Sequence, residues 1–348
     1  MVESLDELKA VVQHNCDITD ARHAQDYSMC IFLLKMRELF RWERAYPFST
    51  ALPKQELGAW LDEREKRWER LRRASYASLR VNGENYPALE SSAINEALHP
   101  EGLLYGGGLG LGMVPHFFLA ELLRVEDHDG YRVRVAGREY ARDLAAPPAM
   151  MQDGAICVRQ ESVRRMVWEK IEEWSWKKQG SAMARAMAHY DFDGDFAAAL
   201  EAMTENETAS VVLHEVGECR AEEIFGHAWR DMLAAVAGTR SEITARAVRD
   251  HVADCTTTLP RLLAADNRAG LHFYFANLTG MRRAIFPELS AAYADWVQDG
   301  RLAHLNECVR EGMAHWTQAG QQILEGYAAA PEDAARAIAD LIPIAAEA

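Results

Sequence analysis

The sequence predicts a mainly α-helical fold, a helical bundle with a small β-hairpin insertion around residues 122–160. Over most of the chain, apolar residues recur at every third or fourth position, as one face of an amphipathic helix requires. Only the middle departs from this pattern, being rich in glycine and then alternating. We therefore expect an N-terminal helical region (1–100), a glycine-rich connector with the hairpin (101–160), and a C-terminal helical region (161–348), together forming one compact unit.

The N-terminal region begins with two predicted helices. Residues 4–13 form a short helix, because Ser4 is followed by Glu7 three positions later, the pattern of a capping box. A longer helix is predicted over residues 20–46. Its middle, CIFLLKM at residues 30–36, is apolar enough that we expect it to be buried on most sides.

The next elements lead into the least helical part of the chain. Pro53 opens a third helix, since proline is favoured in a first turn. The stretch 105–113 contains five glycines but fits neither the dinucleotide fingerprint nor the phosphate loop. We interpret it as a packed connector before a helix at 115–123, with a ligand-binding loop as the alternative. Alternating residues at 125–144 around an Asp-Gly turn predict the hairpin, and residues 155–158 predict one further strand.

The C-terminal region contains the chemically informative stretch, residues 204–232. When it is wound as a helix, most of its ionisable residues fall opposite the apolar stripe, but Glu207, His214 and Glu218 lie near the centre of that stripe. A carboxylate that faces a core is normally paired or bound to a metal. One imidazole with two or three carboxylates is a set that binds iron, manganese or zinc, and helical bundles build such sites in their cores.

The run 241–263 is the predicted partner helix. On it, His251 lies at the edge of the apolar face with Asp254 beside it. The predicted metal ligands are therefore these two residues together with Glu207, His214 and Glu218, for a divalent metal, with iron or manganese ahead of zinc. Glu215 is the candidate proton-transfer group. The alternative is a cluster of the same side chains bonded to one another or to arginines such as Arg246 or Arg268.

The spacing Glu207-x6-His214 resembles the first metal-binding helix of heme-oxygenase-like di-iron oxidases. The resemblance covers that helix alone, and it implies that Glu207 and His214 bind iron in an enzyme that oxidises a small molecule. Those proteins add a carboxylate on a second helix and a His-x3-Asp-x2-His run on a third. This sequence lacks such a run, because the residues four and seven positions after His251 are Cys255 and Thr258.

Two other functions fit the same helix. The segment from His214 to Glu218 is a variant of the zinc-hydrolase motif in which Glu218 replaces the second histidine. An anionic ligand at that place weakens the ability of zinc to acidify its water. The third hypothesis is a non-enzymatic scaffold or interaction protein. The sequence favours metal-dependent chemistry on a small molecule, with oxidation ahead of hydrolysis.

The composition limits the partners. A formal net charge of −15 argues against nucleic acid, because phosphate contacts need clustered lysine and arginine. The six cysteines have no paired spacing, so we expect reduced thiols and a cytoplasmic protein. The N-terminus lacks the features of a signal peptide, and the one long weakly polar run, 103–123, is interrupted by glycines. We expect no membrane association, and a homo-oligomer is compatible with the sequence.

Overall fold

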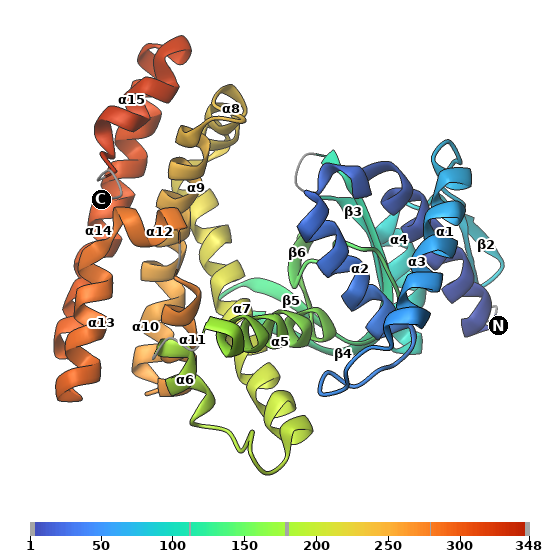
Figure 1. Cartoon of the computed structure of the whole chain (residues 1–348). Helices are drawn as coiled ribbons and strands as arrows, with labels where there is room; N and C mark the ends of the chain where they lie inside the picture. The colour runs from blue at the N-terminus through green and yellow to red at the C-terminus, as the bar shows by residue number, and fades with distance from the viewer. Residues whose placement is uncertain (1–3, 111–112, 178–180, 279, 345–348) are drawn as a thin grey trace. The chain divides into compact units, whose positions relative to one another are not determined.

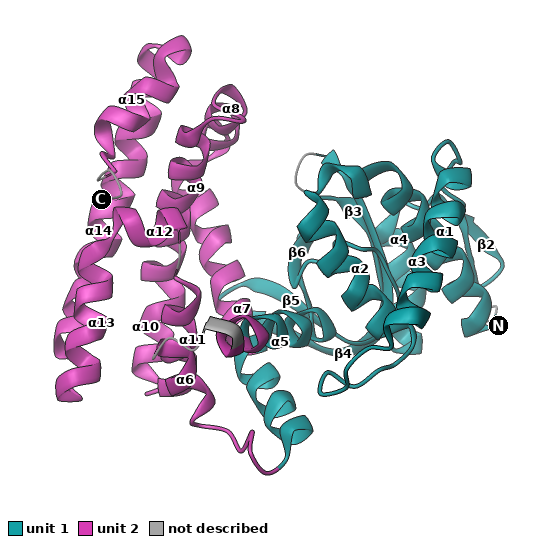
Figure 2. Ribbon diagram, viewed as in Figure 1, with its two compact units in different colours: residues 1–170, 195–208 teal, residues 171–194, 209–348 magenta. Residues whose placement is uncertain are grey.

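The computed structural model describes residues 4–110, 113–177, 181–278 and 280–344. The chain divides into two compact units rather than the one that the sequence suggested (Figure 2). Unit 1 comprises residues 1–170 and 195–208, and unit 2 comprises residues 171–194 and 209–348. Two helices, α5 (Gln160–Lys177) and α7 (Phe196–Phe225), contribute residues to both units.

Unit 1 combines helices with two sheets (Figure 1). Its helical elements before α5 are α1 (Leu5–His23), η1 (Ala24–Asp26), α2 (Met29–Glu43), α3 (Lys54–Leu71), α4 (Ser91–Leu98) and η2 (His99–Glu101). Its strands are β1 (Leu79–Val81), β2 (Glu84–Tyr86), β3 (Leu103–Leu109), β4 (Pro115–His128), β5 (Tyr131–Arg142), β6 (Ala149–Gln152) and β7 (Ala155–Arg159).

The larger sheet of unit 1 has five strands in the order β3-β4-β5-β7-β6. Strands β5 and β7 are parallel, and the other neighbours are antiparallel. The β4–β5 ladder shifts register between Leu119 and Arg124, as β-bulges do. The predicted mainly α-helical class is confirmed, but the predicted small hairpin is wrong in extent: β4 and β5 are the centre of a mixed sheet, and β1–β2 is a second, separate hairpin.

The glycine-rich run forms strand β3 as far as Leu109, and residues 111–112 lie outside the described part of the chain. A Cβ placed at Gly106 would lie 2.0 Å from the ring of Phe118, because this ring packs over the glycine backbone. The predicted connector and the predicted helix at 115–123 are therefore wrong. Phe117 and Phe118 point to opposite faces of β4 and are both buried. The strand is therefore buried on both faces from Phe117 to Ala120, and it alternates in exposure only after Ala120.

Helix α1 covers one face of the sheet. Its capping box is confirmed, since Ser4 N donates to Glu7 Oε2 at 3.2 Å. The helix continues past residue 13 to His23, and the next helix, α2, begins only after Ser28, so the predicted boundaries at 13 and 20 are wrong. The buried residues of α1 pack against the sheet in one hydrophobic cluster that includes Leu8, Val12, Cys16, Phe117 and Leu119.

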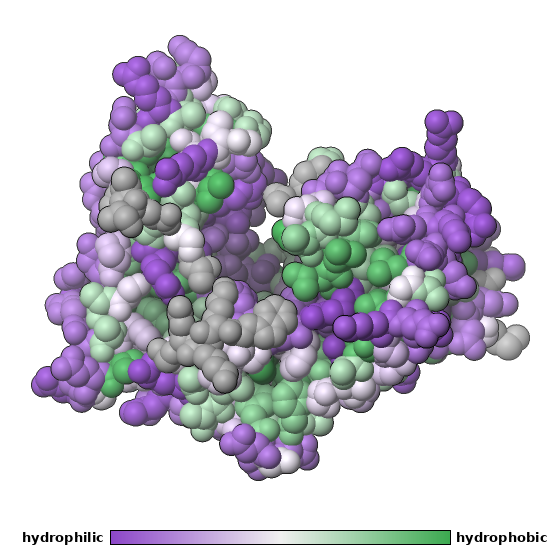
Figure 3. All heavy atoms as spheres, viewed as in Figure 1, coloured by the Kyte–Doolittle hydropathy of each residue, from purple (hydrophilic) through white to green (hydrophobic). Residues whose placement is uncertain are grey.

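Helix α2 is buried only in its second half. Met36, Leu39 and Phe40 pack against Trp60 and Trp68 of α3. The expected burial of residues 30–36 is wrong for the first half: large exposed side chains there are Met29, Ile31, Leu33 and Leu34. Figure 3 shows hydrophobic surface over this part of unit 1.

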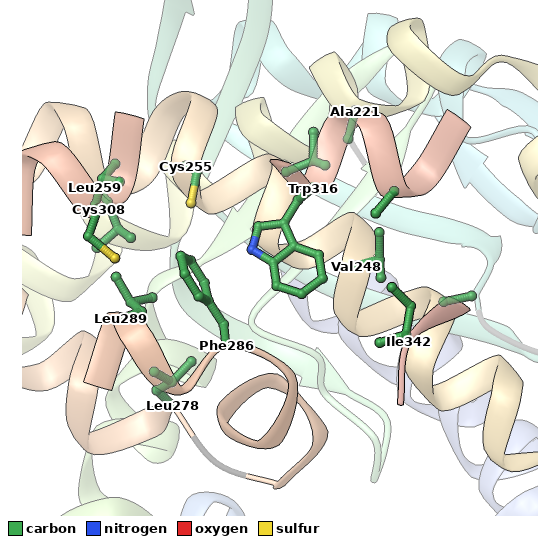
Figure 4. Packing of buried hydrophobic residues seen from close by; sticks show 14 of the residues in the cluster. Ala221, Val248, Cys255, Leu259, Leu278, Phe286, Leu289, Cys308, Trp316 and Ile342 are labelled. Atoms are coloured by element: carbon green, nitrogen blue, oxygen red, sulfur yellow. The ribbon is translucent and has the colours of Figure 1, made fainter. Parts of the chain in front are cut away.

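The regular elements among the described residues of unit 2 are all helices. Besides the shared helices, it contains α6 (Ala182–Met187), which lies between them in the chain, and then α8 (His227–Ala235), α9 (Arg240–Ala253), a π-helical segment η4 (Asp254–Thr258), α10 (Leu259–Ala264), α11 (Arg268–Asn277), α12 (Gly280–Ile285), α13 (Pro287–Asp299), α14 (Ala303–Ala329), η5 (Pro331–Asp333) and α15 (Ala334–Leu341). Figure 4 shows its core, in which Trp316 of α14 lies beside Phe286 and Cys255.

Two glycines shape the helices that carry the predicted site. Gly226 adopts φ 67° and ends α7, so the stretch 204–232 is two helices rather than one. Gly217 lies where α7 and α9 are in close contact: a Cβ there would lie 2.4 Å from the carbonyl oxygen of Ala253. Among the described helices, none combines the length and apolar content that crossing a bilayer requires.

Candidate functional site

Three of the sequence-predicted residues meet in unit 2. His214 Nδ1 lies 2.9 Å from Oδ1 of Asp254, and His214 Nε2 lies 3.6 Å from Oε1 of Glu218. The pair forms across two helices because Gly217 allows α7 to approach the end of α9. Asp254 is the first residue of the π-helical segment, a distortion that is frequent at functional sites.

Asp254 is a buried anion with three partners. Besides His214, it accepts a hydrogen bond from the Tyr274 hydroxyl at 2.9 Å and forms an ion pair with Arg282. Burial would raise the pKa of Asp254, but Arg282 and His214 outweigh burial and hold that pKa well below its usual range. The Asp254 carboxylate therefore stays ionised and places a negative charge beside the His214 ring.

His214 is the protonated partner of this carboxylate. Burial would lower the pKa of His214, but Asp254 and Glu218 outweigh it and raise the pKa well above its usual value. The side chain is 29% exposed. It is therefore an imidazolium with part of its surface in contact with solvent.

Two glutamates lie on the same turns of α7. Glu218 Oε1, the atom that faces His214, also accepts a hydrogen bond from Arg249 at 2.7 Å. Burial would raise the pKa of Glu218, but His214 and Arg249 outweigh it and lower this pKa. Burial, reinforced by Glu218, raises the pKa of Glu215 to about 7. Glu215 can therefore exchange a proton near neutral pH, as a proton-transfer group must.

The other two predicted ligands make different contacts. Glu207 lies in the part of α7 that belongs to unit 1, is buried, and accepts a hydrogen bond from Asn206 at 2.9 Å. His251 donates from Nε2 to the carbonyl of Arg282 at 2.8 Å and stacks on Trp316. Burial lowers the pKa of His251 to about 4, so it is neutral.

The metal-binding role of these residues stays a prediction. Within the described parts of the chain, no three histidine, cysteine, aspartate or glutamate side chains are grouped so as to hold a metal ion. The observed contacts of Asp254 and Glu218 are those of a bonded polar cluster, in which guanidinium groups stand where a cation would bind.

Sequence reasoning missed three members of the cluster: Arg249, Tyr274 and Arg282. The arginines it considered are engaged elsewhere, Arg246 with Glu242 at 2.7 Å and Arg268 with Asp266 at 3.1 Å. Helix periodicity predicts which face a residue occupies, but it does not predict which distant helix supplies its partner. The one local sign of a partly buried arginine in the sequence was the pair Arg282–Arg283, which lies between apolar stretches.

The fold and the cluster define a two-unit, mainly α-helical protein whose second unit contains a buried carboxylate–imidazole–guanidinium cluster. The chain belongs to a family of unknown function, DUF6866. The N-terminal domain of that family matches residues 7–159, and its C-terminal domain matches residues 164–344. The two matches meet at the junction between β7 and α5. No curated protein and no solved structure matches the chain.

Proposed function

We propose that unit 2 is an acid–base catalyst that acts on a small molecule, with His214 as the proton donor. The observation that carries this proposal is the 2.9 Å hydrogen bond between His214 Nδ1 and Asp254. A carboxylate on Nδ1 orients the ring, stabilises the imidazolium and leaves Nε2 for proton exchange with a substrate. Tyr274 and Arg282 support this role, because they hold Asp254 in place and ionised.

The two glutamates complete the proposed chemistry. Glu218, kept anionic by Arg249, lies 3.6 Å from Nε2 and stabilises the imidazolium until His214 gives the Nε2 proton to the substrate. Glu215 is the second proton-transfer group, as the sequence predicted, because burial brings its pKa to about 7. The reaction class is proton transfer, as in hydrolysis or isomerisation.

Replacing His214 with glutamine tests this function. Wild-type protein and variants are screened for turnover against esters, amides and phosphate esters, followed by a pH profile on any active compound. Loss of general acid–base catalysis should lower kcat by about 10²- to 10⁴-fold. The matched control is His304→Gln, because His304 Nδ1 makes the same contact with Asp295, at 2.8 Å, on an exposed surface. Equal turnover in both variants would contradict the proposal.

Metal-dependent chemistry at the same cluster is the second candidate. A histidine that binds a metal almost always donates its other nitrogen to a carboxylate or carbonyl, as His214 does to Asp254. His214 Nε2 and Glu218 Oε1, 3.6 Å apart, would be two ligands, and the ion would displace Arg249 from Glu218. Iron or manganese would supply oxidation, and zinc would supply hydrolysis.

Elemental analysis separates these candidates. Protein purified without chelator should contain stoichiometric iron or manganese for the oxidase, or zinc for the hydrolase. The double variant His214→Ala, Glu218→Ala should lose that metal. Unchanged metal content in the double variant excludes metal chemistry at this cluster. Catalysis without bound metal favours the acid–base function. A protein with neither catalytic activity nor bound metal favours the scaffold hypothesis.

We keep a small-molecule substrate and a cytoplasmic location as parts of this proposal. All six cysteines are free thiols, which suits a reducing compartment. A homo-oligomer stays a prediction, and size-exclusion chromatography with light scattering tests it.

A further inference from the structure

Unit 1 contains a cavity of about 680 Å³ that the chemistry of unit 2 does not use. Its walls come from the second half of α2, the following turn, the end of β5 and the first turns of α5, with side chains of α1 and α3. Eight of the lining residues are lysine or arginine, and four are glutamate. The chain as a whole carries a net charge of −15, so this concentration of positive charge is local.

Two of the lining guanidinium groups are buried and incompletely bonded. Arg142 is 2% exposed and Arg165 is 7% exposed. Within the described part of the chain, Nε of Arg142 and both Nε and Nη1 of Arg165 have no hydrogen-bond partner. Arg142 Nη1 comes no closer than 3.6 Å to Glu139, and Arg165 Nε no closer than 3.7 Å to Glu169. Buried donors without acceptors are costly, and a bound anion would supply acceptors.

The lining carboxylates are engaged with other partners. Glu139 Oε1 accepts from Arg159 at 2.8 Å and from Ser162 at 3.1 Å. Glu38 is bonded to Arg41 at 3.1 Å. Glu139 Oε2 has no hydrogen-bond partner and lies 3.6 Å from Arg142 Nη1, beyond hydrogen-bonding distance. This carboxylate therefore offsets part of the charge of Arg142 without accepting from its donors, and burial lowers the pKa of Arg142 to about 10.

The same cavity has an aromatic wall. The guanidinium carbon of Arg142 lies 5.2 Å from the ring centre of Trp42. Phe48, Tyr46 and Tyr140 also line the cavity. Flat rings of this kind pack against the apolar body of a ligand while the guanidinium groups bind its charge.

We propose that this cavity binds a small organic anion, a carboxylate or phosphate joined to a flat apolar ring. Arg142 and Arg165 bind the anionic group, because guanidinium donors match carboxylate and phosphate oxygens. Trp42 and Phe48 pack on the ring. The volume lies within the range of small-molecule sites. A nucleic acid does not fit, because the chain is acidic and the two guanidinium groups are buried.

Calorimetry and thermal shift on the full chain test this site with four probes: benzoate, benzamide, adenosine monophosphate and inorganic phosphate. Benzoate and benzamide have nearly the same shape but differ in charge. We expect saturable binding of benzoate or adenosine monophosphate, weaker binding of phosphate alone, and none of benzamide. Binding of benzoate identifies the anionic group as a carboxylate, and binding of adenosine monophosphate identifies it as a phosphate. Equal binding of benzoate and benzamide, or no binding of either organic anion up to millimolar concentration, overturns the proposal.

Variants locate the binding. Arg142→Met keeps the apolar stem and should weaken binding at least tenfold. Arg124→Met is the matched control, since Arg124 is a half-exposed arginine of unit 1 outside the cavity lining, and it should leave affinity unchanged. Arg138→Ser removes an exposed charge from the lining, so it should weaken binding and reduce the salt dependence of binding. This second variant tests the site even if Arg142→Met fails to fold. Unchanged affinity in both cavity variants overturns the proposal.

Discussion

The carbonyl oxygen of Ala253 lies where a side chain at residue 217 would begin, only 2.4 Å from a Cβ built on Gly217. Gly217 is less than one turn after His214 on α7, and Ala253 directly precedes Asp254. This close approach of two backbones brings the imidazole of His214 to the carboxylate of Asp254. Gly217, which has no side chain, therefore allows His214 and Asp254 to form their hydrogen bond.

The first prediction concerns this contact. Gly217→Ala should destabilise the protein by about 1–3 kcal/mol, because a Cβ in this space forces the helices apart. Gly58→Ala is the control: nothing lies within 4 Å of a Cβ there, so it should stabilise helix α3 by up to about 1 kcal/mol. Urea unfolding measures both. Equal effects of the two substitutions would show that α7 and α9 are not in close contact at Gly217.

The second prediction is a pH dependence. The pKa of His214, measured by NMR, should lie well above 6.5, and Asp254→Asn should lower it. Because the folded-state pKa is raised, the stability that His214 contributes is complete below the unfolded-state pKa and is lost as the pH rises through the folded-state pKa. The difference in unfolding free energy between wild type and His214→Gln should therefore shrink with rising pH. A constant difference would argue against a protonated His214.

The third prediction concerns the packing of the glycine run against Phe118. Gly106→Ala should destabilise unit 1 by about 1–3 kcal/mol, since the ring of Phe118 occupies the space of the new Cβ. Gly108→Ala should be tolerated, because the nearest atom, from Met150, is 3.8 Å away. Thermal unfolding of the two variants provides the comparison. Similar melting temperatures would mean that Phe118 does not pack on β3.

The fourth prediction concerns the buried ion pair of unit 1. Arg159→Met should cost about 3–5 kcal/mol, because it leaves Glu139 charged and without its 2.8 Å partner, and both side chains are fully buried. Arg336→Met breaks a pair with Asp340 in which both side chains are largely exposed. That control should change stability by less than about 1 kcal/mol. Denaturant titration measures both, and a small loss for Arg159→Met would contradict the burial of the pair.

Local patterns predicted several features correctly. The capping box of Ser4 and Glu7 is present, and the mainly α-helical class holds for the chain as a whole. These features depend on residues three or four positions apart, which are neighbours on a helix whatever the rest of the chain does. The predicted helix at 115–123 was wrong because the apolar run of a strand buried on both faces has the same pattern as a buried helix. The boundaries at residues 13 and 20 were wrong because α1 continues through both of them to His23.

The sequence likewise predicted only part of the candidate site. Helical spacing singled out His214 and Glu218 on α7 and put Asp254 on the partner segment, and the structure brings these three side chains together. It did not indicate that Arg249 and Arg282 neutralise the two carboxylates. It also did not reveal the cavity around Arg142, whose walls come from segments more than a hundred residues apart.

By itself, the amino-acid sequence determined the helical class, the acidic character and the ionisable residues on an inward helix face, because periodicity and composition are local properties. Only the tertiary structure decided which charges meet. The approach of α7 to α9 at Gly217 pairs His214 with Asp254, and the packing of α2, β5 and α5 assembles the basic cavity. Contacts between distant segments depend on how helices and strands pack, and no spacing along the chain encodes that packing directly.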